Sequence, residues 1–299
     1  MKVSIAKNAK IFFIISAVII LVGLVFIFTF GLNFGLDFAG GMIMTMELDR
    51  TFETSEVRAI VDNYDKEAEI TAAGDTMTQV IISSKLDLTE EERRLMIEEI
   101  QTAFDVDEET LAPQVDKVSA SMSGEITYQS IMACIVVVVC MLVYITIRFE
   151  FLFGVAAIIA LLHDILLVVG MFAIFRIQVN TPFVAALLTI LGYSINNTII
   201  IFDRVRENRK RYKKYDYENL VDDSIQQCLR RSINTSITTL LTITTLYVLG
   251  VDDVKSFALP LIVGFLGGTY SSLFLAAPIW YKLRKAVDNS QKKKRQLAK

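Results

Sequence analysis

The sequence is poor in the residues that hold most metal sites and disulfide frameworks, with one histidine and three cysteines in 299 residues. Cys134 and Cys140 lie in one long apolar run, and Cys228 lies in a charged segment. No cysteine or histidine cluster has the spacing of metal ligands. Residues 31–128 contain no cysteine, so we expect no disulfide in that segment, and we expect no bound metal and no organic cofactor.

Charge is also scarce, and it is unevenly spread. Charged residues make up 21% of the chain and hydrophobic residues 53%, and the mean hydropathy is positive. The charges cluster in residues 37–125, 203–231 and 282–299. The apolar runs between them reach the length of about 20 residues that a membrane helix needs. This pattern excludes a soluble protein and predicts an α-helical polytopic membrane protein.

The apolar runs predict six transmembrane helices, each near the usual length. They cover residues 11–30, 129–147, 152–175, 182–202, 233–250 and 257–281. The first run follows three lysines, as a signal peptide would. It is too long for the apolar region of such a peptide, and no A-x-A-like cleavage site follows it. We expect it to stay in the chain as a membrane helix.

Basic residues predict the orientation in the membrane. Lys2, Lys7 and Lys10 precede the first run, DRVRENRKRYKKY follows the fourth, and KKKRQLAK ends the chain. By the positive-inside rule, both termini, a loop over residues 203–232 and a tail over 283–299 face the cytoplasm. A basic groove with aromatic platforms would indicate nucleic-acid binding, but none is visible. The basic residues therefore serve topology and attract anionic lipid headgroups.

The opposite side receives residues 31–127, which hold 22 acidic and 7 basic residues, a net charge of −15, so that the remainder of the chain carries +12. We place an extracytoplasmic domain at residues 34–127, between a first unit at 1–33 and the remaining helices at 128–282. The domain contains no histidine, no cysteine and no serine in a G-x-S-x-G turn. We expect no enzyme, and either an acidic spacer or a docking surface for extended polypeptide or a partner domain.

Strand and helix patterns alternate within that domain. Its predicted strands are GMIMTMEL, AEITAA, TQVIISS and one near TLAPQVDKVSA, and its predicted helices are TSEVRAIVDNYDK and LTEEERRLMIEEIQTAF. Thr89 and Glu92 have the spacing of a capping box, and Gly74-Asp75 is typical of a turn. The order βαββαβ predicts a ferredoxin-like α+β domain.

Polar residues inside the predicted membrane helices are candidates for function, because ionisable groups are costly there. Asp164 is too short to reach water from mid-helix, so it indicates function or a structural ion pair. His163 points about 100° away from Asp164 around the helix. It is either a proton-exchanging group or a polar packing residue, and we favour packing. Asn196 and Asn197 are polar but not ionisable, and such pairs can hold helices together with ~0.6 kcal/mol per hydrogen bond.

Hydroxyl and glycine residues recur in the later membrane helices. Thr235, Thr238, Thr242 and Thr245 form one helical stripe, for which we favour hydrogen bonds to their own backbone. Small residues allow close helix approach. Helix packing is the role that we predict for Gly192, Gly264, Gly267 and Gly268.

Five motifs resemble those of the SecD/SecF family of the RND superfamily, in its SecF branch. GLDFAGG at residues 35–41 resembles the start of the family's outer domain. The membrane motifs are IRFEFLFG, ALLHDILL, RRSINTSITTLLT and the long, specific AALLTILGYSINNTIIIFDRVREN at residues 185–208. The similarity runs along nearly the whole chain.

The resemblance implies an accessory subunit of protein export in the bacterial inner or plasma membrane. Such a subunit pairs with SecD beside the SecYEG channel, with YajC and YidC-type proteins and the unfolded preprotein as further partners, and it uses a proton or sodium gradient. Matched residue by residue, Asp37, Gly40 and Gly41 belong to the outer motif, Asp164 to the third membrane helix, and Arg231 to the RxINTS motif.

One position departs from the family, which usually has Asn-Asp where this chain has Asn196-Asn197. An amide has no titratable carboxyl group, so Asn197 cannot relay a proton. It can coordinate Na⁺, hydrogen-bond Arg231 or hold the helices together. Two other functions stay open: an RND-type half-transporter of lipid or small molecules, and a translocon scaffold without ion coupling of its own.

Overall fold

The computed structural model describes residues 4–74, 77–213 and 216–297, and the chain forms two compact units. The first, here called the membrane unit, comprises Met1–Asn33 and Met132–Lys299. The second, here called the α/β unit, comprises Phe34–Ile131. Each unit has its own hydrophobic core.

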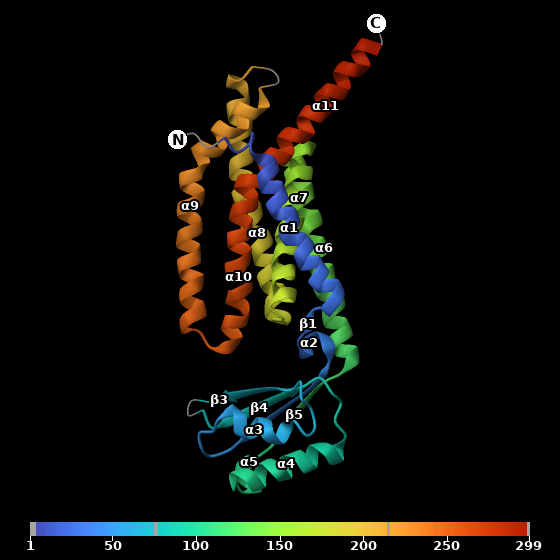
Figure 1. Ribbon diagram of the computed structural model, residues 1–299, viewed down its shortest axis with the longest axis vertical. Coiled ribbons are helices and arrows are strands. Elements are labelled where there is room, and N and C mark those ends of the chain that lie inside the picture. Colours follow the sequence, from blue (N-terminus) through green and yellow to red (C-terminus); the bar gives the residue numbers. More distant parts are fainter. Residues whose placement is uncertain (1–3, 75–76, 214–215, 298–299) are drawn as a thin grey trace. The chain divides into compact units, whose positions relative to one another are not determined.

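Long helices make up the membrane unit (Figure 1). In chain order they are α1 (Ala9–Phe30), α6 (Ala120–Arg148), α7 (Phe151–Ile174), α8 (Thr181–Asn208), α9 (Tyr217–Leu249) and α10 (Asp252–Ser271). The last continues through a π-helical turn, η2 (Ser272–Ala276), into α11 (Ala277–Leu297). The residues of α6 before Met132 belong to the α/β unit. The described residues contain six helical segments long and apolar enough to cross a membrane, which confirms the predicted number.

Helical structure extends well beyond the apolar runs. In the segment 203–232 that we predicted to be a loop, α8 continues to Asn208, a 3₁₀ turn η1 follows (Arg209–Arg211), and α9 begins at Tyr217. The predicted tail is helical to Leu297. Ion pairs at i,i+3, such as Arg206–Asp203 at 2.7 Å, support the helix outside the apolar layer. Loss of hydrophobicity therefore marks where a helix leaves that layer, and not where it ends.

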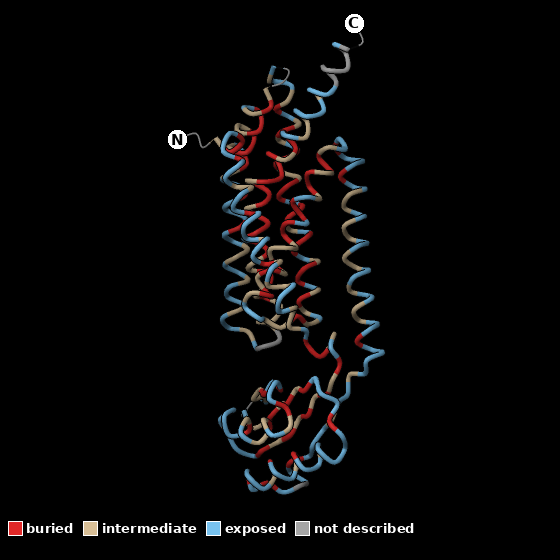
Figure 2. The backbone as a smooth tube through the Cα atoms, turned by 45° about the vertical axis from the view of Figure 1, so that its right-hand side comes forward, coloured by how far each residue is buried: buried red, intermediate tan, exposed pale blue. Residues whose placement is uncertain are grey.

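The membrane helices differ in how much of their surface lies inside the unit. Half of the residues in the most apolar windows of α7 and α8 are buried, and 61% in the window of the last span, against 11% for α1, 6% for α6 and 11% for α9. Figure 2 shows the buried stretches gathered along the middle of the bundle. Thus α7, α8 and α10 are central, whereas α1, α6 and α9 turn apolar surface outward.

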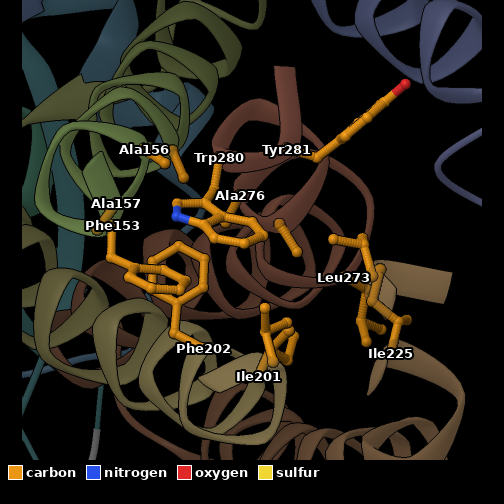
Figure 3. Close-up of a cluster of buried hydrophobic side chains, with 14 of the residues drawn as sticks. Phe153, Ala156, Ala157, Ile201, Phe202, Ile225, Leu273, Ala276, Trp280 and Tyr281 are labelled. Atoms are coloured by element: carbon orange, nitrogen blue, oxygen red, sulfur yellow. The ribbon is translucent and has the colours of Figure 1, made fainter. Parts of the chain in front are cut away.

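A cluster of aromatic and aliphatic side chains closes one end of the membrane unit (Figure 3). The Trp280 indole is fully buried and stacks on the Phe153 ring, with centroids 4.6 Å apart and planes within 6°. Phe202 packs on the same ring at 4.8 Å. Small residues beside them, such as Ala156 and Ala276, leave room for the indole. Burial of these large side chains fixes α7, α8 and α11 together.

The segment before α1 is tied to the same end of the unit. Asp222 on α9 accepts a hydrogen bond from the Ser4 hydroxyl and another from the Ala6 backbone N–H, each 2.6 Å long. Ile5 between them is only 2% exposed and belongs to the buried cluster. One carboxylate therefore fixes the start of the described chain.

The α/β unit contains a four-stranded antiparallel sheet with the order β3-β4-β2-β5. Its elements are β2 (Gly41–Glu47), α3 (Thr54–Val61), β3 (Glu69–Ala73), β4 (Gln79–Ser84), α4 (Glu90–Phe104), α5 (Glu108–Leu111) and β5 (Gln114–Val118). Burial alternates along β2, with Met42, Met44 and Met46 inside. The helices cover this face with Val57, Met96 and Phe104 among others. Asp75 of the predicted Gly74-Asp75 turn lies outside the described residues.

Short elements flank the sheet and the helices. The segment after α1 contains β1 (Asn33–Phe34) and α2 (Leu36–Ala39), and β1 forms a two-stranded sheet with β6 (Gln178–Val179). Arg176 donates to the carbonyl oxygens of Phe30 and Gly31, each at 2.9 Å. Since the last carbonyls of a helix lack partners inside the helix, these bonds satisfy the end of α1.

The predicted capping box at the start of α4 is confirmed. Glu92 N–H donates to the Thr89 hydroxyl at 3.3 Å, and the Glu92 carboxylate accepts from the Thr89 N–H at 2.8 Å. The backbone bond from Thr89, and then the hydroxyl bond, lowers the pKa of Glu92 below its ordinary value of 4.5. The reciprocal bonds explain why the helix begins at Glu90.

Acid should loosen this helix start. Because the folded-state pKa of Glu92 is depressed, its contribution is complete above about pH 4.5 and is lost as the pH falls through the lower folded value. We expect amide exchange in the first turn of α4 to accelerate in that range, measured by hydrogen–deuterium exchange. Glu92→Gln should remove this pH dependence, and unchanged behaviour of the variant would contradict the assignment.

Asp222→Ala should release the segment that precedes α1. Loss of two hydrogen bonds to one carboxylate is expected to cost about 2 kcal/mol, measured as a lower unfolding midpoint in detergent. Proteolysis near residue 6 should also accelerate. Glu218→Ala on the same helix is the matched control, and equal effects of both variants would refute a specific role of Asp222.

Candidate functional site

Asp164 lies in the centre of α7 and is completely buried. Its Oδ2 accepts hydrogen bonds from Ser194 Oγ on α8 at 2.5 Å and from Ser271 Oγ on α10 at 2.8 Å. Its Oδ1 lies 3.0 Å from His163 Nδ1. Three central helices thus meet at one carboxylate, and short hydroxyl side chains supply the donors that a buried carboxylate requires.

From the helical projection we predicted that His163 points away from Asp164. In the structure its ring turns back towards that residue. Its Nδ1 contacts the neighbouring carboxylate at 3.0 Å. The projection fixes only the Cα–Cβ direction, and the side-chain torsions of histidine bring the ring back. The described residues place no lysine or arginine within ion-pair distance of Asp164, so the structural ion pair considered from sequence has only histidine as its partner.

Polar contacts continue from His163 towards α1. The His163 and Tyr270 rings lie 6.0 Å apart. The Tyr270 hydroxyl donates to the Phe12 carbonyl oxygen at 2.9 Å, and Ser16 Oγ donates to that hydroxyl at 3.3 Å. The Tyr270 hydroxyl and its partners on α1 therefore follow a ring contact with His163 on α7.

The π-helical turn begins directly after Ser271. Ser272 Oγ lies 3.0 Å from Thr198 Oγ1 on α8 and donates to the Gly268 carbonyl oxygen at 2.6 Å. Ser271 and Ser272 therefore connect α10 and the π-helical turn to both α7 and α8. Such turns within α-helices occur frequently at functional sites.

Glycines bring α10 close enough for these short side chains to reach. An added Cβ at Gly264 would lie 2.3 Å from Ile190 Cδ1, and one at Gly268 would lie 3.1 Å from Ser194 Cβ. At Gly267 it would meet Leu167 Cδ2 on α7 at 3.3 Å. By contrast, Gly192 has no heavy atom within 4 Å of its Cβ position.

The other predicted membrane residues lie elsewhere. Asn197 is 1% exposed, and its Nδ2 has no hydrogen-bond partner among the described residues. Asn196 and Arg231 are exposed, and no described contact joins Arg231 to Asn197. The structure thus gathers Asp164 and His163, but not Asn196, Asn197 or Arg231, at one point. The threonine stripe on α9 hydrogen-bonds its own backbone, as Thr242 does to the Thr238 carbonyl at 3.1 Å.

Sequence reasoning missed Ser194, Ser271 and Tyr270, which complete the cluster. Their signal was weak because serine and tyrosine are common in membrane helices without a role. Ser194 precedes Asn197 by one helical turn, and Ser271 follows the glycine cluster. These positions could have been flagged only with knowledge of which helix faces oppose Asp164.

The GLDFAGG segment lies at the start of the α/β unit sheet. Gly40 and Gly41 have φ of +75° and +139°, which favour glycine. A Cβ on Gly41 would lie 2.2 Å from the Ser84 carbonyl oxygen, so the backbone of β4 excludes any side chain. Asp37 is half-buried on α2. The motif therefore shapes the entry into the sheet.

The Asp164 cluster consists of a carboxylate, two hydroxyl groups and an imidazole. A carboxylate and two hydroxyl oxygens are hard oxygen donors, and the carboxylate and imidazole can both exchange protons. No group of three or more histidine, cysteine or acidic residues that could hold a metal ion occurs in the described part of the chain.

Comparisons with known proteins match nearly the whole chain. The family model described as protein export membrane protein SecD/SecF, C-terminal, matches residues 98–286, and the SecD/SecF GG motif matches residues 25–51. The protein translocase subunit SecF of Sebaldella termitidis is 35% identical over 95% of this chain and 93% of its own length. That of Petrotoga mobilis is 36% identical over 94% and 96%.

Longer relatives combine two parts in one chain. The protein translocase subunit SecDF of Bacillus subtilis is 34% identical over 92% of this chain but only 37% of its own length. The crystal structure of SecDF from Thermus thermophilus, described as a translocon-associated membrane protein, aligns with a TM-score of 0.79 at 31% identity. The alignment covers 95% of this chain, which spans 39% of that SecDF chain.

Substitution of the packing glycines should separate the helices that build the site. Gly264→Leu forces new atoms into Ile190 and should cost about 1–3 kcal/mol or more, measured as a lower unfolding midpoint in detergent. Gly192→Leu is the matched control, because open space surrounds that position. Equal stability of the two variants would contradict the close α8–α10 packing.

Proposed function

The chain belongs to the SecD/SecF family of protein export membrane proteins, and we propose from that premise that its Asp164 cluster couples ion movement to export. The family and its SecF relatives identify it as an accessory subunit of Sec protein export. The Asp164 hydrogen bonds, which join α7, α8 and α10 at membrane depth, are the observation that carries the ion role. The proposal requires no covalent chemistry.

The ion role follows from how the carboxylate is held. Protonation or cation binding changes which hydrogen bonds Asp164 can accept, and its partners lie on two other helices. A change in ion occupancy therefore alters the contacts among three helices at once. This provides a physical link between an ion gradient, of protons or sodium, and a shift of the membrane helices.

The proposal places the chain in the bacterial inner or plasma membrane with both termini in the cytoplasm. The distribution of basic residues supports this orientation, which puts the α/β unit outside. We assign that unit to the ferredoxin-like class, because the sheet order β3-β4-β2-β5 with all neighbours antiparallel fits a βαββαβ chain. Its proposed role is to contact the emerging polypeptide.

SecD is the first partner in this proposal, since relatives exist in which one SecDF chain contains the matching segment. We further propose that the pair works beside SecYEG, with YajC and YidC-type proteins nearby. The apolar outer surfaces of α1, α6 and α9 are available to lipid and to a partner's helices. The half-transporter alternative has no observation in its favour.

The test is the rate of preprotein export by pulse-chase in cells that carry Asp164→Asn. This variant keeps the shape of the side chain but cannot exchange a proton in the physiological range. We expect export to fall to the rate of cells that lack the chain, while the membrane level of the protein stays normal. Asp203→Asn, which changes a carboxylate at the exposed end of α8, should export like the parent.

Ionophores then separate the alternatives. A protonophore or a sodium ionophore should slow export in the parent and have no further effect in Asp164→Asn. The ionophore that slows export identifies the coupling ion. If Asp164→Asn exports normally and collapse of either gradient acts on it as on the parent, Asp164 is not the coupling group. If deletion of the whole chain impairs export, but Asp164→Asn and the ionophores do not, the chain is a scaffold.

A further inference from the structure

A second polar feature follows the interface between α8 and α9, which run antiparallel. The Tyr193 hydroxyl donates to Ser236 Oγ at 3.0 Å. Further along, Cys228 Sγ lies 3.9 Å from the Ile200 carbonyl oxygen, and Asn208 Nδ2 donates to Ser224 Oγ at 3.0 Å. Ser224, Cys228, Ser232 and Ser236 recur at every fourth position of α9, so one face of small side chains lies against α8.

The series of contacts is interrupted at one position. Asn197 follows Tyr193 by four residues, and Ser232 precedes Ser236 by four. Because the helices are antiparallel and rise about 1.5 Å per residue, both side chains lie about 6 Å beyond the Tyr193–Ser236 bond, in the same direction. The register therefore sets Asn197 opposite Ser232.

Both side chains are buried with a polar atom unsatisfied. Asn197 is 1% exposed and Ser232 is 3% exposed. Asn197 Nδ2 and Ser232 Oγ have no hydrogen-bond partner among the described residues. Burial of such a group without a partner is unfavourable, because the group has lost its hydrogen bonds to water. Two unsatisfied groups at the same level of one interface indicate a shared partner.

Ser232 also differs from its neighbours on α9. Ser224, Thr235 and Ser236 each donate to the carbonyl oxygen four residues earlier, at 2.7, 2.9 and 2.8 Å. The Ser232 hydroxyl makes no such bond. Its oxygen is therefore available to a group in the interface.

The surroundings favour a neutral partner over an ion. The side chains one turn away on each helix carry no charge: Tyr193 and Ile201 on α8, and Cys228 and Ser236 on α9. Asp164 is engaged with Ser194 and Ser271 instead, and Arg231 is exposed. Two neutral dipoles cannot offset the cost of removing a cation from water, whereas a water molecule needs only two to four polar partners.

We propose that a single buried water molecule bridges Asn197 and Ser232 and fastens α8 to α9. The water oxygen accepts a hydrogen bond from the Asn197 amide N–H. Between the water and the Ser232 hydroxyl, either group can be the donor. Position 197 is then a structural contact within this chain. The inference does not depend on the proposed export function, because it concerns the packing of two helices.

A structure of the full chain at a resolution that reveals ordered waters tests the site directly. We expect a peak within hydrogen-bond distance of both Asn197 Nδ2 and Ser232 Oγ. A direct bond between the two side chains, or separate partners for each, would overturn the proposal.

A double-mutant cycle tests the same link in solution, with the full chain in detergent. Asn197→Leu and Ser232→Ala should each lower the unfolding midpoint by roughly 2–4 °C, and the double variant should lose less than their sum. Asn196→Leu and Thr235→Val change exposed neighbours of the two residues and are the matched controls. They should change the unfolding midpoint little. Additive losses, or no loss, would contradict a shared water.

The cycle is measured in sodium, potassium and N-methylglucamine chloride. Equal midpoints in the three salts are expected for a water site. Stabilisation by sodium alone that disappears in Asn197→Leu would identify a cation site instead and overturn the proposal. Since export is not measured, failure of this inference is distinguishable from failure of the proposed function.

Discussion

A carboxylate in the middle of an apolar layer must have hydrogen-bond donors within reach, and the centre of the membrane unit is built around this requirement. Asp164 receives two serine hydroxyls from two other helices and faces the imidazole beside it. Serine side chains are short, so their helices must come close. The glycines of α10 permit this approach, because any larger residue at Gly264 would meet Ile190. The hydrogen-bond donors that Asp164 requires and the close packing that the α10 glycines permit therefore favour the same arrangement of helices.

The remaining helices follow from that centre. With α7, α8 and α10 packed on one another, α1, α6 and α9 bury little of their surface and present apolar faces outward. At one end of the unit, large aromatic side chains replace glycine contacts, and Trp280 stacks on Phe153. The two kinds of packing have different consequences. Aromatic burial fixes the helices in place, whereas the polar centre holds them through hydrogen bonds to one carboxylate.

Two polar locations in the membrane unit thus have different characters. The Asp164 cluster contains exchangeable groups and connects three helices. The α8–α9 interface contains hydroxyl and amide groups together with apolar residues. Asn197 belongs to the second location, although its sequence neighbour Ser194 belongs to the first. One helix therefore serves both, because residues 194 and 197 project from α8 towards different neighbours.

Much of this protein could be predicted from its sequence. The length of the apolar runs predicts six membrane helices, and period-two and capping patterns predict the strands and helices of the α/β unit. Asp164 stands out by chemistry alone, because a short carboxylate at membrane depth has no route to water. The glycines at 264, 267 and 268 indicate close packing, and the GLDFAGG motif and the long motif at residues 185–208 indicate the family. These signals are local in the chain, or depend on burial that any membrane helix experiences.

Only the tertiary structure decides which partners complete the site. Ser194 and Ser271 are separated from Asp164 by 30 and 107 residues, and only the packing of α8 and α10 on α7 brings them to it. The contact between His163 and Asp164 depends on side-chain torsions that a helical projection does not contain. The separation of Asn197 from Asp164, and its register with Ser232, arise from the relative rotation and translation of antiparallel helices. A sequence specifies which groups need partners, but their identity depends on distances between helices that no local pattern encodes.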